Sequence, residues 1–214
     1  MGSGIDIANV AMMYVCLLFS LSVHEAAHAT MANRCGDPTG RLLGRMTLNP
    51  VPHIDPIGTV VLPLFMMISG TPYMFGWAKP VPFNPRNLGN IRRDTALVGI
   101  AGPLSNLLLI LLFTILLRIA VTISGGDVLG SPLGQIMFYL ILINSILMLF
   151  NLIPIPPLDG HHLLHLFLPP SATEAIERIG PFGIIIVIVL VWNTPILQVP
   201  MGIILNLVQW FVTG

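Results

Sequence analysis

Five consecutive residues, His24-Glu25-Ala26-Ala27-His28, carry two imidazoles and a carboxylate in a chain that is otherwise poor in charge. On an α-helix, residues four positions apart lie on the same face, so His24 and His28 can bind one zinc ion together. Glu25 then lies beside the metal, where it can take a proton from an attacking water. Ionisable side chains inside an apolar segment mark a functional site by default, and an inter-helix hydrogen-bonding cluster is the alternative. The pattern therefore predicts a zinc hydrolase.

A third protein ligand is needed, because a hydrolytic zinc site takes three side chains and keeps a further position for water. Asp159 is the best candidate, since it follows an apolar segment directly, within the sequence NLIPIPPLDG at 151–160. The prolines before it hold an irregular backbone, which is tolerated at membrane depth only where it lines a cavity. A simple turn residue in Leu-Asp-Gly is the alternative. We expect one Zn²⁺, bound by His24, His28 and Asp159.

The composition describes an integral membrane protein. The chain is 55% hydrophobic and 8% charged, against about 25% charged in an ordinary soluble domain, and its mean hydropathy is +0.89. A formal net charge of zero offers no basic surface, which excludes nucleic-acid binding. With only short polar loops, residues 1–214 are expected to form one membrane-embedded domain, with a core at 7–168 and C-terminal helices at 171–213.

Apolar runs and their boundaries predict an all-α polytopic membrane protein. We expect about five transmembrane helices, near 7–33, 95–121, 133–152, 180–192 and 196–213. The segment at 40–90 is different, because it is rich in proline and its apolar part, 55–70, has only sixteen residues. A re-entrant helix or β-hairpin is expected there.

The two halves of the predicted site constrain the topology. His28 and Asp159 can meet only if an even number of crossings separates them, and the helices near 95–121 and 133–152 supply two. Residues 55–70 must therefore turn back. Seven of the nine basic residues lie between 34 and 93, which indicates that both flanks of this segment are cytoplasmic. We expect the N-terminus outside a bacterial or archaeal cell membrane and the metal site toward the cytoplasm.

Three motifs in this order resemble the site-2 protease family of intramembrane zinc metalloproteases. They are HEAAH at the end of one span, AGPLSN at 101–106, and NLIPIPPLDG at the end of another span. The resemblance covers roughly residues 10–165 and implies cleavage of transmembrane protein substrates within the lipid bilayer, with Glu25 as the base. It also implies that Asn151 donates a hydrogen bond to the substrate carbonyl in the transition state. A helix C-terminal residue is the alternative for Asn151.

The proline-rich stretch at 72–85 is the candidate substrate surface. A helical substrate hides its peptide bonds in its own hydrogen bonds, so it must unwind before cleavage and can then add to a free backbone edge. We expect Trp77, Lys79, Pro80 and Val81 to contact it. A membrane metallohydrolase of a lipid or small amide and a non-catalytic adaptor are the competing functions. The presence of Glu25 argues against the adaptor, because zinc binding alone does not need it.

Overall fold

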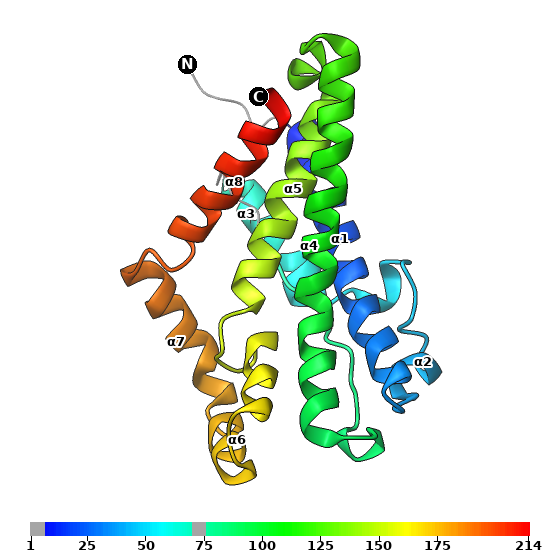
Figure 1. Cartoon of the computed structure of the whole chain (residues 1–214), viewed down its shortest axis with the longest axis vertical. Helices are drawn as coiled ribbons and strands as arrows, with labels where there is room; N and C mark the ends of the chain where they lie inside the picture. Colours follow the sequence, from blue (N-terminus) through cyan, green and yellow to red (C-terminus); the bar gives the residue numbers. More distant parts are fainter. Residues whose placement is uncertain (1–6, 70–75) are drawn as a thin grey trace.

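The computed structural model describes residues 7–69 and 76–214, and within these ranges the chain is helical and contains no strand (Figure 1). The expected all-α class is confirmed. The longer helices are α1 (Ile7–Arg34), α3 (Leu62–Ile68), α4 (Ile91–Ser124), α5 (Pro132–Asn151), α6 (Pro170–Glu177), α7 (Gly180–Asn193) and α8 (Gln198–Thr213). The other helical segments are the four-residue α2 (Thr39–Leu42) and the 3₁₀ or π segments η1 (Val51–His53), η2 (Pro56–Val61), η3 (Pro85–Asn87), η4 (Asp127–Gly130) and η5 (Asp159–Leu166).

Helices α1, α4 and α5 form the centre of the molecule and carry the site (Figure 1). One apolar cluster joins α1 to α5 through Cys16, Leu17 and Leu21 against Leu140 and Leu147. The turn from α4 to α5 begins at Gly125, whose φ of 63° is a left-handed helix end that suits glycine. Because α5 runs back along α4, the chain returns to the level of the α1 histidines.

The expected count of five transmembrane helices is not confirmed. Within the described residues, α1, α4 and α5 have 28, 34 and 20 residues and are long and apolar enough to cross a membrane. A fourth span is counted only if the bent pair Pro170–Glu177 and Phe182–Asn193 is one crossing. The reason is length, because α7 and α8 have 14 and 16 residues, fewer than the 20 or so that span the hydrocarbon core.

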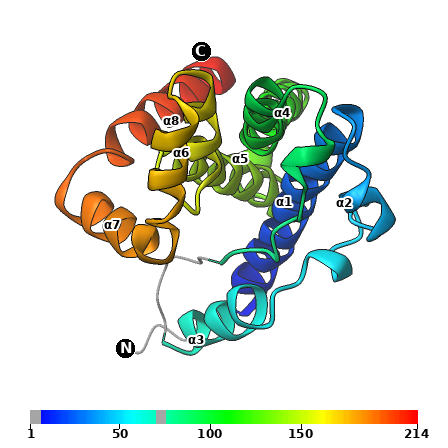
Figure 2. The same cartoon turned by 90° about the horizontal axis from the view of Figure 1, so that it is seen from below.

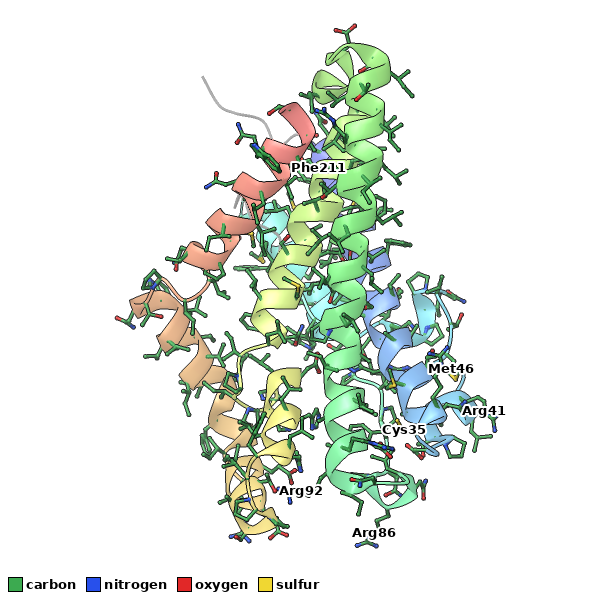
Figure 3. The ribbon with its side chains drawn as sticks, in the orientation of Figure 1. Cys35, Arg41, Met46, Arg86, Arg92 and Phe211 are labelled. Atoms are coloured by element: carbon green, nitrogen blue, oxygen red, sulfur yellow. The ribbon has the colours of Figure 1, made fainter. Side chains whose placement is uncertain are left out.

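The segment between α1 and α4 leaves the bundle and comes back to the point where it started. Just after α1, the Cys35 carbonyl accepts a hydrogen bond of 3.0 Å from the Gly89 N–H, two residues before α4 begins. Figure 3 shows Cys35, Arg41, Arg86 and Arg92 together at this lower end, far from Phe211. The β-hairpin expected at 40–90 is not present among the described residues of this segment, and residues 70–75 lie outside them.

The C-terminal helices cover one side of the central bundle. Seen end-on, α6, α7 and α8 lie on one side of α5, while α1 and α2 lie on the other (Figure 2). Buried Val212 of α8 packs against α4 and α5, and its carbonyl accepts a 2.8 Å hydrogen bond from Arg118. Val187 of α7 is fully buried against Ile153 and Leu158. These contacts hold the loop that carries Asp159 against the bundle.

Candidate metal centre

Helix α1 delivers the HEAAH motif into the interior. His24, Glu25 and His28 are buried, with 3%, 8% and 8% of each residue's surface exposed. The predicted i, i+4 geometry is present, because the two imidazole Nε2 atoms lie 3.1 Å apart.

Asp159 reaches the same point from the other half of the chain. It is the first residue of η5, and its Oδ2 lies 3.0 Å from His24 Nε2 and 3.3 Å from His28 Nε2. The structure thus brings together the three side chains predicted as metal ligands, across more than 130 residues of sequence. They are the only group of three His, Cys, Asp or Glu residues in the described chain able to hold one ion.

The chemistry of these three atoms fits a bound cation. His28 Nδ1 lies 2.7 Å from the Val98 carbonyl, which can only accept, so the ring carries a hydrogen at Nδ1 and the neutral ring has a lone pair at Nε2. His24 Nδ1 lies 2.6 Å from Asn106 Oδ1, another acceptor, so His24 likewise carries its hydrogen at Nδ1 and a lone pair at Nε2. Two lone pairs and a carboxylate oxygen therefore face one another. Their separations approach the roughly 3.3 Å expected between ligands in a tetrahedral zinc site with bonds of about 2.0 Å.

Two glycines of α4 allow the ligands to come this close. A Cβ at Gly102 would lie 2.3 Å from His28 Nε2 and 2.7 Å from His24 Nε2. A Cβ at Gly99 would lie 3.0 Å from the Asp159 carbonyl oxygen. The small residues at these positions let α1 and the Asp159 loop approach α4 closely, and at Gly102 the approaching groups are the two candidate ligand imidazoles.

The predicted substrate residues belong to an extended segment, 76–84, that runs past the metal site. The Trp77 and Lys79 N–H groups donate to the Gly58 and His53 carbonyls at 3.2 and 2.8 Å. Further along, the Val81 N–H donates to Glu25 Oε2 at 2.8 Å. The segment is therefore fixed to the His53 and Gly58 backbone at one end and to the expected catalytic base in its middle.

Two buried charges that the sequence did not identify as site residues hold this segment in place. Arg45, 5% exposed, donates to the Lys79 carbonyl. Asp37 is fully buried and accepts hydrogen bonds from the Asn84 N–H at 2.8 Å and from Asn87 Nδ2 at 2.7 Å. Burial disfavours the Asp37 carboxylate, but hydrogen bonds from Thr39, Asn87 and backbone N–H groups outweigh it and lower its pKa. Sequence position gave no signal for either role, because both contacts depend on how the loops fold.

Asn151, expected as a transition-state donor, has another partner in this structure. Its Nδ2 donates to the Leu147 carbonyl at 3.0 Å, one turn back along α5. No hydrogen bond within the described residues joins it to the three candidate metal ligands. The three histidines after Asp159 are not among the candidate ligands. The His161 and His162 rings contact each other with centroids 3.9 Å apart and planes tilted by 39°, and His165 pairs with Glu177 at 3.3 Å.

Comparisons with known proteins agree with this site. Peptidase family M50 matches residues 12–191. The chain is 37% identical over 180 residues to "Putative zinc metalloprotease YwhC" of Bacillus subtilis (strain 168), covering 83% of this chain and 78% of that protein. It is 30% identical over 194 residues to "Putative zinc metalloprotease Rip2" of Mycolicibacterium smegmatis, covering 91% and 70%. No solved structure matches significantly. With its family match and its paired histidines and aspartate, the chain belongs to peptidase family M50, the site-2 proteases, and is a membrane-embedded zinc metalloprotease.

Proposed function

We propose that His24, His28 and Asp159 hold the zinc ion of this intramembrane protease and that Glu25 is its general base. The convergence of two Nε2 atoms and Asp159 Oδ2 within 3.0–3.3 Å carries the assignment. Zinc in such a site polarises a water and the peptide carbonyl that the water attacks. Glu25 takes the proton of the attacking water and passes it to the leaving amine.

The orientation of Glu25 supports its role as the base. Its Oε2 accepts the Val81 N–H, which fixes the side chain, and Oε1 remains available to receive a proton. Because the side chain is 8% exposed, few solvent molecules compete for it. The same contact places the extended segment one hydrogen bond from the reacting groups.

The substrate is proposed to be an unwound transmembrane segment that pairs with the free edge of residues 76–84. Backbone groups of alternate residues point to the same edge of an extended chain. Trp77, Lys79 and Val81 use their N–H groups toward the protein. Pro80 and Pro82 face the other way, and within the described residues no hydrogen bond uses their carbonyls.

The two prolines leave this edge with hydrogen-bond acceptors only, because proline has no N–H to donate. The carbonyls at 80 and 82 are acceptors with no donor beside them, whereas Ala78 is buried in the cluster with Leu17 and Leu21 and does not extend this edge. An incoming extended peptide therefore contributes mainly its own N–H groups. We further propose that Asn151 turns from the Leu147 carbonyl toward the substrate carbonyl when substrate is bound.

The proposed topology is one membrane-embedded domain with the metal site toward the cytoplasm. The hydrogen bond between Cys35 and Gly89 supports a re-entrant path for the segment between α1 and α4. Exposed Arg41 and Arg86 lie at the same end of the molecule (Figure 3). Apolar α4 side chains such as Leu108 and Ile123, 59% and 81% exposed, suit contact with lipid. Cysteines replacing Arg41 and Arg86 should react with an impermeant thiol reagent from the same side, and labelling from opposite sides would disprove the path.

The function is tested with purified Glu25→Gln and a single-span protein substrate in detergent. Glutamine keeps the shape and the acceptor oxygen but is not a base, so cleavage should fall at least about 100-fold, the usual contribution of a general base. Glu177→Gln is the matched control, because that carboxylate is half exposed and pairs with His165 outside the site. Zinc content should be unchanged in both. Equal cleavage by wild type and Glu25→Gln would contradict the assignment.

A further inference from the structure

A chain of buried amides connects the His24 ring to all three central helices. His24 Nδ1 of α1 contacts Asn106 Oδ1 of α4 at 2.6 Å, and Asn106 Nδ2 donates to Asn144 Oδ1 of α5 at 2.7 Å. Asn144 Nδ2 then donates to Ser20 Oγ, back on α1, at 2.9 Å. Asn106, Asn144 and Ser20 have no exposed surface. Buried amides in apolar helices are costly unless every polar atom is used, and here they form one continuous chain.

A backbone carbonyl determines which way the two asparagine amides are turned. An asparagine amide can be turned over, so its oxygen and nitrogen are assigned from their partners. Asn144 Nδ2 lies 2.7 Å from the Leu140 carbonyl, which can only accept a hydrogen bond, so the nitrogen of Asn144 faces that carbonyl. Its oxygen then faces Asn106, and the Asn106 oxygen must face His24.

The orientation of the Asn106 amide determines which ring nitrogen of His24 carries the hydrogen. Because Asn106 presents an acceptor, His24 carries its hydrogen on Nδ1, and Nε2 keeps the lone pair that points at Asp159 and His28. We propose that Asn106 is a positioning residue for the metal, which fixes the tautomer and ring orientation of His24. The inference rests on the proposed ligand set.

The two histidines differ in how they are held. His28 is oriented by the Val98 backbone carbonyl, which no side-chain substitution removes. His24 depends on a side chain, so it is the ligand whose binding geometry a substitution can weaken. Groups that orient metal-binding histidines change metal affinity by about 10- to 100-fold when removed.

The test compares zinc affinity of the full chain in detergent, measured by competition with a chelating dye. Asn106→Leu removes the acceptor, so zinc should bind about 10- to 100-fold more weakly than in wild type. Asn106→Asp keeps an acceptor oxygen for His24 and should restore most of the affinity. A role in helix packing alone predicts the reverse order, because leucine suits an apolar bundle and a buried carboxylate does not.

Controls separate this inference from the ligand assignment and from misfolding. Thr114→Val removes another buried polar group of α4, one without a hydrogen bond in the described chain, and should leave zinc affinity unchanged. Asn144→Leu removes the partner that orients Asn106, so it should weaken zinc binding, but less than Asn106→Leu does. Asn144→Leu replaces Asn106→Leu in the comparison if Asn106→Leu does not fold. Wild-type affinity in Asn106→Leu, or weaker binding in Asn106→Asp than in Asn106→Leu, overturns the role of Asn106. Wild-type affinity in His24→Ala overturns the ligand assignment as well.

Discussion

Gly102→Ala is expected to remove the metal while leaving the fold intact. The added methyl would lie 2.3 Å from His28 Nε2 and 2.5 Å from His24 Cε1. Ordinary contacts between such atoms are about 3.5 Å or more, so at least one ring must move by about 1 Å. Metal-ligand distances tolerate only about 0.2 Å, and a 1 Å misplacement costs on the order of 100-fold in rate. Both zinc content and cleavage should therefore fall sharply.

The effect on stability should be small, which distinguishes this variant from a folding defect. Alanine is favoured over glycine inside a helix by roughly 0.5–1 kcal/mol, and the clashing atoms are the ends of side chains that can turn away. Gly202→Ala is the matched control, because a Cβ at this α8 position meets nothing within 4 Å. Zinc content and substrate cleavage are measured for both variants beside thermal unfolding of the metal-free protein. Wild-type zinc content and cleavage in Gly102→Ala would refute the close approach of α1 and α4.

Two further predictions concern the extended segment and its anchor. Because hydrogen bonds lower the pKa of Asp37, its contribution to stability should be present at neutral pH and be lost as the pH falls below about 4, the pKa of an unfolded aspartate. Thermal unfolding of wild type and Asp37→Asn between pH 3 and 7 checks this. An equal pH dependence of stability in both proteins would contradict it. Pro80→Cys should form a disulfide with a cysteine placed near the cleavage site of a substrate. Arg86→Cys, which lies beyond the extended segment 76–84, should not. Equal cross-linking at both positions would argue against pairing of the substrate with the edge of this segment.

Local sequence patterns predicted the parts of the site that depend on short-range geometry. The spacing of His24 and His28 fixes their relation on any helix, and a polar residue after an apolar segment identified Asp159. The AGPLSN motif contributed to the family resemblance, whereas the close approach of Gly102 to the two imidazoles appears only in the structure. These inferences needed no knowledge of how distant loops fold.

Contacts that depend on the return of distant backbone could not be predicted in the same way. The hydrogen bond from Val81 to Glu25 requires the path of the whole segment after α1, and proline content alone gives no register. Asn144 lies in an apolar helix, and its hydrogen bonds to Asn106 and Ser20 depend on how three helices pack, which the sequence pattern does not give. The expected five spans are not confirmed, because α7 and α8 have 14 and 16 residues, fewer than the 20 or so that cross the hydrocarbon core.

Metal analysis of wild type and Asp159→Ala tests the central claim most directly, because Asp159 joins the two halves of the chain at one ion. Asp127→Ala, an exposed aspartate in the turn between α4 and α5, is the control. We predict one zinc per chain in wild type and Asp127→Ala, and a large loss of zinc in Asp159→Ala. Full zinc content with wild-type affinity in Asp159→Ala would contradict the account.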